Sequence, residues 1–355
     1  MLSNPLIAFD FWGAGNLGDD LMLDGFLRGI EHCGVAYEGR LSSLSAHDIG
    51  SQRTRFPRVR WVDSRNQHTL FEAIARAELL LGVGDTPFQV TCGDWFLRHL
   101  SAIMDHLDAG TEAIFIGVGA EEEVLERAPD FVPILQRVSR CSTRDAFSCA
   151  VLRRLSAQAA TCLSVGGDLA HISLEQLAAA VSPNRQFALG VVLGIDTLSG
   201  ADLGVIRGFL QALPGPVAFI TQDCRDEPGF EWELFRAWTK GWRSALRAKL
   251  IPRRPDYAAC TVAELVLPFA ECATILTSRL HGILAAAWMG CRVAAIGRSS
   301  KVIAIAEKLG VPLVKPPLGE EVLRSVMVHA IHVPRDLLVK CRDEAYEGLE
   351  ACRFW

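Results

Sequence analysis

The feature that most constrains this fold is an alternation of short β-rich runs with helical patterns, which occurs in two successive series. In the first series the β-rich runs lie at residues 6–11, 78–81, 113–117, 138–143 and 160–165. Helical patterns follow at residues 17–33, 91–109 and 145–155. Because strands that run parallel need long, usually helical crossovers, this alternation predicts a parallel sheet wrapped by helices.

A second series begins after the turn-rich stretch 181–185. Its β-rich runs lie at residues 187–193, 217–221, 274–277 and 293–296, and its helical patterns at residues 201–213, 228–248, 283–289 and 301–309. Two series of similar size predict an α/β protein of two Rossmann-like domains that face a cleft. We assign residues 1–182 and 183–334 to these domains, and residues 335–355 to a C-terminal amphipathic helix. Residues 249–257 interrupt the helical pattern and are predicted to be a surface loop.

Composition limits the class of protein. The chain has 355 residues, of which 50% are hydrophobic, so it can bury the cores of two domains. Its net charge of −5 gives no general attraction to nucleic acid. No apolar run reaches the roughly 18 to 20 residues of a membrane span, and the N-terminus lacks a signal peptide's basic region. We expect a cytoplasmic protein, either free or at the inner face of the membrane.

The cysteines and histidines do not predict a metal site. The 11 cysteines are scattered, with no Cys-x-x-Cys pair, and most lie in or beside apolar runs. We interpret them as reduced cysteines that serve as small core residues. The histidines show no metal-ligand spacing. The sequence therefore predicts neither a metal nor a tightly bound cofactor.

The strongest chemical signal lies at residues 274–290, where a strand delivers Ser278, Arg279, His281 and Gly282 to a turn that opens a helix of small residues. The N–H groups and dipole of a helix start, equivalent to roughly half a positive charge, favour an anion. Arg279 offers a fork of donors suited to phosphate or carboxylate, and a histidine can titrate near neutral pH. In the alternative interpretation, Arg279 forms an internal salt bridge and His281 bonds a neighbouring carbonyl.

Two further cations follow the next β-rich run. Arg298 follows residues 293–296, and Lys301 is the first residue of the helical pattern at 301–309. We predict that they join Arg279 in binding an anion.

The turn at residues 13–20 is the first candidate site in the N-terminal half. Gly15 and Gly18 would let the backbone approach a ligand, and Asn16 could orient a hydroxyl group. Asp19 is a candidate base. The glycine spacing fits a dinucleotide-binding motif, but no acidic residue ends a second strand about 20 residues later. The alternative makes Asn16 a helix cap and Asp19 a first-turn acid.

Other polar residues follow β-rich runs, where ligands of such sheets bind. They are Gly84 and Asp85, Arg144 and Asp168, and Gln222 and Asp223. Each has an alternative structural reading, as a simple turn or as an ion pair between adjacent loops.

Several of these motifs together resemble the polysaccharide pyruvyl transferase family. The segment 271–310 carries Ser-Arg-Leu-His-Gly at 278–282 and Ser-Lys-Val at 300–302. Asn-Leu-Gly-Asp at 16–19, Thr-Arg-Asp at 143–145 and Gly-Asp-Leu-Ala at 167–170 are similar to further landmarks of the family. The turn at residues 82–90 departs from the family's longer glycine run, which leaves the acceptor in question.

The resemblance implies a glycosyltransferase-B-like fold with an acceptor-binding N-terminal domain and a donor-binding C-terminal domain. It also implies phosphoenolpyruvate as co-substrate and a sugar or lipid-linked glycan as acceptor. The product would be a cyclic pyruvate ketal, with release of phosphate. In this reaction His281 would act as the acid and Asp19 as the base, while Arg279 and Lys301 would bind anions.

Two other functions fit the sequence. A glycosyltransferase that uses a nucleotide sugar would also need a cationic helix start for phosphates, although the second domain lacks an obvious ribose-binding carboxylate. A catalytically silent binding or scaffold protein could also retain the fold. The sequence determines neither the acceptor sugar, nor the stereochemistry of the ketal, nor the oligomeric state.

Overall fold

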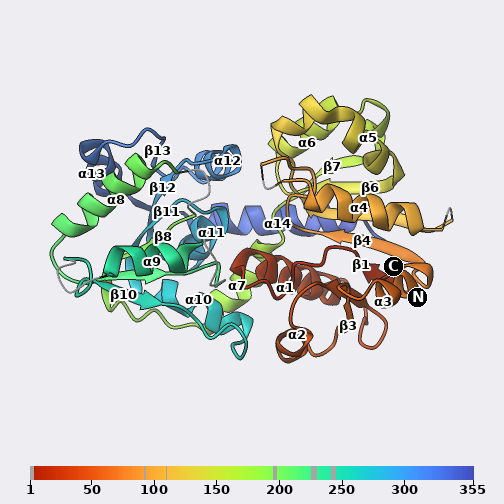
Figure 1. Cartoon of the computed structure of the whole chain (residues 1–355), viewed down its shortest axis with the longest axis horizontal. Coiled ribbons are helices and arrows are strands. Elements are labelled where there is room, and N and C mark those ends of the chain that lie inside the picture. The colour runs from red at the N-terminus through yellow and green to blue at the C-terminus, as the bar shows by residue number, and fades with distance from the viewer. Residues whose placement is uncertain (1–3, 92, 109, 195–197, 225–229, 241–244) are drawn as a thin grey trace. The chain divides into compact units, whose positions relative to one another are not determined.

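The computed structural model describes residues 4–91, 93–108, 110–194, 198–224, 230–240 and 245–355. The chain divides into two compact units (Figure 1). The first comprises Met1–Ala14, Gly18–Ser173 and Lys340–Trp355, and the second comprises Gly15–Leu17 and Leu174–Val339. Unit boundaries therefore fall within three of the described helices, after the first residue of α1 (Leu17–His32) and inside α7 (Ala170–Ala180) and α14 (Arg335–Ala351).

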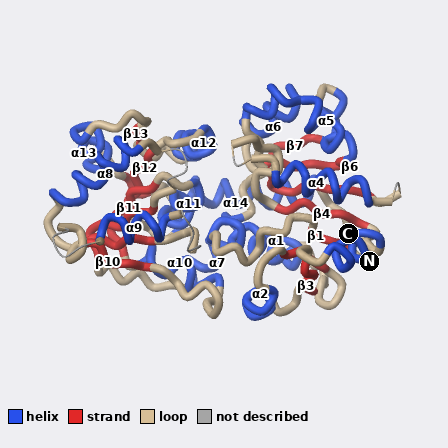
Figure 2. The backbone as a smooth tube through the Cα atoms, in the orientation of Figure 1, coloured by secondary structure: helices blue, strands red, loops and turns tan. Residues whose placement is uncertain are grey.

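The first unit is built on a parallel sheet whose described strands have the order β3-β2-β1-β4-β5-β6-β7 (Figure 2). The strands are β1 (Pro5–Ile7), β2 (Ser42–Ser45), β3 (Arg60–Asp63), β4 (Leu79–Val83), β5 (Glu112–Val118), β6 (Val138–Thr143) and β7 (Leu163–Val165). The helices are α1 (Leu17–His32), α2 (Ile49–Arg55), α3 (Gln67–Ala75), α4 (Trp95–His106), α5 (Ala128–Arg137), α6 (Ala146–Leu155) and α7, with short 3₁₀ turns at Glu122–Arg127 and Gln158–Cys162.

The second unit has a sheet of order β10-β9-β8-β11-β12-β13, to which β14 adds an antiparallel strand beside β12. The strands are β8 (Phe187–Val192), β9 (Val217–Ile220), β10 (Leu250–Arg253), β11 (Cys272–Thr277), β12 (Arg292–Ile296), β13 (Leu313–Val314) and β14 (Ile331–His332). The helices are α8 (Gly200–Ala212), α9 (Glu231–Thr239), α10 (Val262–Ala270), α11 (Leu280–Trp288), α12 (Ser300–Lys308), α13 (Glu320–Val328) and α14. The prediction of two Rossmann-like α/β domains is confirmed.

Each sheet is buried by helices that pack on it. In the first unit Phe9 packs edge-on against Phe96 and Phe115, with ring centroids 5.2 and 5.5 Å away. In the second unit the core joins Phe209 of α8 to Phe219 of β9 and Leu276 of β11. Strands buried on both faces have continuous apolar sequences, which is why β4, β5 and β12 are visible in the sequence.

Local side-chain bonds set several helix starts. Asp145 accepts a hydrogen bond from the Ser148 amide at 2.6 Å and so caps α6. Ser199 with Asp202 forms a reciprocal capping box at the start of α8, and Thr261 with Glu264 forms one at α10. Each box satisfies backbone N–H groups that a helix start otherwise leaves without partners.

Five of the described strands were missed by the periodicity, namely β2, β3, β10, β13 and β14. β2 and β3 have the polar sequences Ser-Ser-Leu-Ser and Arg-Trp-Val-Asp, which lack an apolar run. The predicted surface loop at residues 249–257 is wrong in part, because residues 250–253 form β10, an edge strand paired with β9. Pro252 is tolerated there because one side of an edge strand needs no N–H donor. Of the predicted helix 228–248, α9 covers residues 231–239, and residues 228–229 and 241–244 lie outside the described residues.

The C-terminal part of α14 packs on the loop that follows β7. A Cβ atom on Gly167 would lie 2.6 Å from the amide nitrogen of Ala345, and one on Gly166 would lie 2.8 Å from the Cα of Gly348. The two glycines therefore allow direct contact between backbones. No helix in the described part of the chain is both long and apolar enough to cross a membrane.

The packing around Gly25 generates the first prediction. Gly25→Ala should destabilise the first unit by about 1 to 3 kcal/mol, because its Cβ would lie 1.9 Å from the carbonyl oxygen of Leu169. The matched control is Gly204→Ala in α8, where a Cβ meets nothing within 4 Å. That change should stabilise the protein by about 1 kcal/mol through helix propensity. Urea unfolding followed by circular dichroism measures both, and an unchanged midpoint for Gly25→Ala would contradict the packing.

Candidate functional site

The candidate site of the second unit begins at the carboxyl end of β11. Ser278 is fully buried there, and its hydroxyl donates to the Gly194 carbonyl at 3.0 Å and accepts from the Gly194 amide at 2.8 Å. The Ser278 carbonyl accepts from Nε of Arg298 at 2.7 Å. The predicted anion-binding residue Ser278 therefore ties the loop after β8 to those after β11 and β12.

Arg279 is the N-cap residue of α11, and its guanidinium is held by carboxylates of its own unit. It forms an ion pair with Glu231 of α9, and its Nη2 lies 3.9 Å from Oδ2 of Asp223. The predicted cation thus lies at the expected place, with its charge balanced inside the fold. This is the internal salt bridge that the alternative interpretation of Arg279 described.

Glu231 organises the loop after β9. Its side chain is fully buried, and its Oε2 accepts from the amides of Gln222 at 2.6 Å and Asp223 at 3.1 Å. Burial raises the pKa of the Glu231 carboxyl, while the Arg279 guanidinium and the two backbone donors oppose that rise. The sequence did not single out Glu231, because an acid in a first helical turn is most often exposed.

The first turn of α11 carries His281, which is partly exposed, and Gly282, which is buried. A Cβ atom on Gly282 would lie 2.3 Å from Oγ1 of Thr277 and 3.4 Å from Oε1 of Gln222. The side chain of the N-cap residue makes no capping bond, so the first N–H groups of α11 are not consumed by a side-chain cap.

A second helix starts beside the first, because β12 pairs with β11 in parallel. The N-cap residue of α12, Ser299, also makes no capping bond, and its buried hydroxyl oxygen has no hydrogen-bond partner among the described residues. Lys301 lies in the first turn of α12, and a Cβ on Gly194 would lie 2.8 Å from the guanidinium of Arg298. Adjacent strands thus present two helix N-termini and two cations.

The loop after β9 also binds the turn from the N-terminal end of the chain. Asn16 and Asp223 form an antiparallel bridge, with hydrogen bonds of 2.8 Å from the Leu17 amide to the Gln222 carbonyl and from the Cys224 amide to the Gly15 carbonyl. Gly15 has a φ of +92°, which favours glycine. Gln222 is 2% exposed, and within the described residues its Nε2 has no hydrogen-bond partner.

In the first unit the predicted residues follow β4, β6 and β7. Gly84 and Asp85 both adopt a positive φ, 62° and 55°, in a turn packed on Met22 of α1. Arg144 is buried and donates from Nη2 to the Thr86 hydroxyl at 3.2 Å. This hydrogen bond joins the loops that follow β4 and β6.

Three acids of the first unit have different surroundings. The Asp168 carboxylate accepts a hydrogen bond from the Ala170 amide at 2.9 Å, at the first residue of α7. Asp19 is 7% exposed in the first turn of α1, which also contains Gly18. Asp20 is fully buried and pairs with Arg55 at 3.2 Å, which gives it a structural role.

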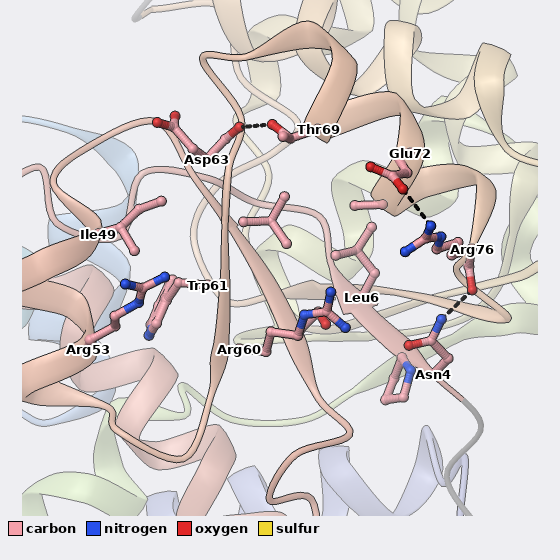
Figure 3. Close-up of a pocket in the computed structure, with 14 residues that line it drawn as sticks. Asn4, Leu6, Ile49, Arg53, Arg60, Trp61, Asp63, Thr69, Glu72 and Arg76 are labelled. Atoms are coloured by element: carbon pink, nitrogen blue, oxygen red, sulfur yellow. Dashed lines mark hydrogen bonds and ion pairs between the residues drawn. The ribbon is translucent and has the colours of Figure 1, made fainter.

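A separate pocket of about 330 Å³ lies in the first unit, beside β1 and β3 (Figure 3). Leu6 and Trp61 contribute apolar surface and Arg53 and Arg60 contribute charge, while Arg76 pairs with Glu72 at 2.5 Å. None of the residues predicted to be functional lines this pocket. Among the described residues, no group of His, Cys, Asp and Glu has an arrangement that could hold a metal ion.

Comparison with family models shows to which protein family this chain belongs. The family model for polysaccharide pyruvyl transferase matches residues 16–300 of this chain, which include Asn16, Arg144 and His281. The chain belongs to the polysaccharide pyruvyl transferase family. The resemblance inferred from the motifs is thereby confirmed, and with it a transferase family that acts on polysaccharide. No curated protein matches the chain.

Solved structures show the fold of this pyruvyl transferase family member. UDP-GlcNAc 2-epimerase from Methanocaldococcus jannaschii is 10% identical, with a TM-score of 0.57 and 96% of each chain covered. The enzyme of that name from Rickettsia bellii is 12% identical, with a TM-score of 0.58, covering 98% of this chain and 93% of its own. HepE from Anabaena, solved with UDP-glucose, is 13% identical with a TM-score of 0.56, covering 98% and 95%. These similarities confirm the glycosyltransferase-B-like fold.

The Glu231 carboxylate of this pyruvyl transferase family member generates the second prediction. Glu231→Ala should cost about 3 to 5 kcal/mol of stability, because it leaves Arg279 without its principal carboxylate and two buried amides without an acceptor. Glu233→Ala, an exposed acid of the same helix, should change stability by about 0.5 kcal/mol or less. Urea unfolding followed by tryptophan fluorescence compares the two, and equal midpoints would show that the buried pair contributes nothing.

Proposed function

We propose that this protein transfers the enolpyruvyl group of phosphoenolpyruvate to two hydroxyl groups of a sugar, forming a cyclic pyruvate ketal on a polysaccharide or its precursor. The proposal assigns donor binding to residues 183–334 and acceptor binding to residues 1–182. It treats phosphoenolpyruvate as a co-substrate that is consumed in the cytoplasm, with no tightly bound cofactor.

One observation carries the proposal: α11 and α12 start side by side, without side-chain caps, next to Arg298 and Lys301. Backbone N–H groups at a helix start bind anions, and a phosphate and a carboxylate on one small molecule can occupy two such starts together. The buried Nε2 of Gln222 and hydroxyl of Ser299 add polar groups without partners among the described residues. A compact molecule with two anionic groups suits this set of donors.

The proposed reaction needs one proton donor and one proton acceptor. Protonation of the C3 methylene of phosphoenolpyruvate makes C2 electrophilic, and a sugar hydroxyl then forms a C–O bond to C2 while its proton passes to a base. The bond from C2 to the phosphate oxygen breaks, and a second hydroxyl closes the ketal as it loses its proton. The products are the ketal and inorganic phosphate, so atoms and charge balance.

We assign the acid to His281, which is partly exposed in the first turn of α11. Asp19 remains the proposed base. Arg279 stays in the donor site, where Glu231 balances its charge, and Arg298, Lys301 and the two helix starts are the other proposed anion-binding groups. The residues proposed to contact acceptor or to line its site are Gly15, Asn16, Gly18, Gly84, Asp85, Arg144, Asp168, Gln222 and Asp223.

The third prediction concerns donor binding. Phosphoenolpyruvate at a hundredfold excess over its Kd should stabilise the native state by about 2.7 kcal/mol and raise the Tm by several degrees. Lys301→Ala should reduce this shift, whereas Lys308→Ala, an exposed lysine at the other end of α12, should not. UDP should shift the Tm weakly or not at all. A shift with UDP alone, abolished in Lys301→Ala, would instead indicate a glycosyltransferase.

The fourth prediction concerns the acid. His281→Ala should keep the wild-type Tm but lose roughly 10² to 10⁴ in turnover, the usual contribution of a positioned acid. Phosphate release from phosphoenolpyruvate in the presence of a panel of sugar acceptors measures it. His329→Ala, an exposed histidine at the end of α13, is the control and should keep full activity. Undiminished turnover in His281→Ala would remove His281 from the mechanism.

A further inference from the structure

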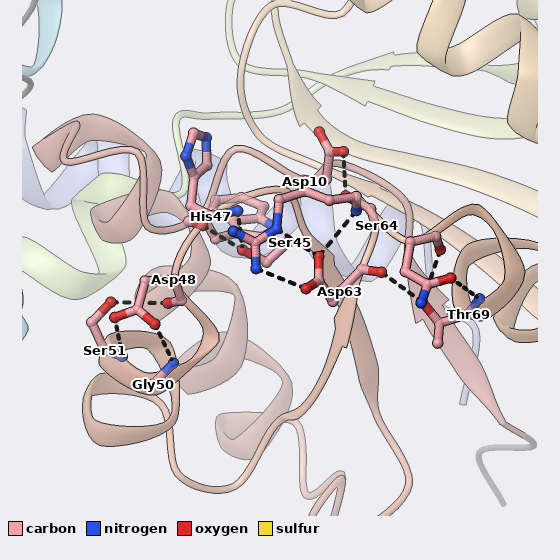
Figure 4. Close-up of polar contacts among 12 residues, drawn as sticks. Asp10, Ser45, His47, Asp48, Gly50, Ser51, Asp63, Ser64 and Thr69 are labelled. Atoms are coloured by element: carbon pink, nitrogen blue, oxygen red, sulfur yellow. Dashed lines mark hydrogen bonds and ion pairs between the residues drawn. The ribbon is translucent and has the colours of Figure 1, made fainter.

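A polar cluster lies at the carboxyl ends of β1, β2 and β3 and involves none of the residues assigned above (Figure 4). Asp10 follows β1, Ser45 ends β2, and Ser64 follows β3. Backbone hydrogen bonds join these loops, from Ala46 to the Asp10 carbonyl at 2.8 Å and from Ser64 to the Ser45 carbonyl at 2.9 Å. In a parallel α/β sheet, ligands bind at this edge.

Asp10 is the centre of the cluster. Its Oδ2 accepts from the Ser64 hydroxyl at 2.8 Å and lies 3.6 Å from Nε2 of His99 on α4. The same His99 nitrogen lies 3.0 Å from the Ala8 carbonyl oxygen, so the imidazole is held against β1. The Asp10 side chain keeps 10% of its surface exposed, and that of His99 keeps 15%. The pair is thus rigid but open at one side.

Trp95 provides an aromatic surface beside this pair. It precedes His99 by one helical turn, and residues four apart lie on the same face of a helix. Its indole meets the ring of Phe11 edge-on at 6.0 Å and that of Phe96 at 5.0 Å. Trp95 is nevertheless 41% exposed, whereas Phe11 is buried. The indole is therefore fixed in position with a large part of its apolar surface in water.

The charge of the cluster disfavours an anion. Hydrogen bonds from Arg65 hold the pKa of Asp63 below its ordinary value, and the amides of Gly50 and Ser51 do the same for Asp48. Among the described residues that form hydrogen bonds within the cluster, the carboxylates of Asp10, Asp48 and Asp63 outnumber the guanidinium of Arg65, which is already paired with Asp63. A ligand here is more favourably a neutral molecule with many hydroxyl groups than a phosphate or carboxylate.

We propose that Trp95, Asp10 and His99 form a binding site for a pyranose ring of the acceptor. The apolar face of the sugar would lie on the indole, and ring hydroxyls would donate to Asp10 and bond His99. An aromatic surface next to a few convergent polar groups is the usual composition of a ligand site. The assignment of the bound sugar as acceptor rests on the proposed function, whereas the sugar site itself rests on this geometry.

The fifth prediction tests the sugar site directly by saturation-transfer difference NMR. The probes are methyl β-D-glucopyranoside, methyl β-D-galactopyranoside and methyl α-D-mannopyranoside, titrated separately. At least one should bind the wild type with a Kd in the millimolar range. Trp95→Ala should weaken that binding about tenfold, because stacking on the indole is lost, and Trp95→Phe should recover part of it. Asp10→Asn should weaken it as well.

The control variant is Leu267→Ala, since Leu267 is also 41% exposed but belongs to α10 of the second unit. It should bind each glycoside as the wild type does. Trp95→Ala should keep the rise of the Tm with phosphoenolpyruvate, because Trp95 belongs to the first unit and the proposed donor site to the second. Wild-type glycoside affinity in both Trp95→Ala and Asp10→Asn, or no binding of any glycoside, would overturn the site. Sugar binding without any effect of phosphoenolpyruvate on the wild type would overturn only the donor assignment.

Discussion

The buried Glu231 carboxylate is the interaction on which the second unit's site depends. It binds the amides of Gln222 and Asp223 and pairs with Arg279, so one side chain joins the loop after β9 to the start of α11. A buried carboxylate is costly unless it is paired, and here Oε2 accepts two backbone hydrogen bonds while Oε1 forms the ion pair with Arg279. The same loop also forms backbone hydrogen bonds with Gly15 and Leu17, which belong to the second unit.

Parallel pairing determines where the helix starts of this site lie. Because β11 and β12 are neighbours that run in the same direction, the helices that follow them begin at the same edge of the sheet. Each helix start contributes partial positive charge from N–H groups that no side chain caps. Arg298 and Lys301 lie at the same edge of the sheet, and Arg279 is paired with Glu231. Helix starts of this kind bind anions.

The first unit differs in chemistry at the corresponding edge of its sheet. Acids and hydroxyls follow β1, β2 and β3, and the rings of Phe9, Phe11, Phe96 and Trp95 pack on one another in the same unit. An apolar surface with acceptor oxygens suits a sugar, whereas helix starts with cations suit a phosphate. The two sheets therefore share the strand order of their first six strands but carry different side chains at this edge.

The sequence by itself determined the fold class, the family and most of the strand ends from which functional side chains emerge. Those signals are local: apolar periodicity, caps such as Asp145, and short motifs such as Ser278 to Gly282. It could not reveal β2, β3 and β10, whose polar or proline-containing strands are stabilised by pairing and not by a run of apolar residues. Only the tertiary structure decided that Glu231 neutralises Arg279, that Asn16 pairs with Asp223, and that His99 meets Asp10. These contacts join residues that lie far apart in the chain. Strand order and helix packing determine which residues meet, and no local sequence pattern shows either.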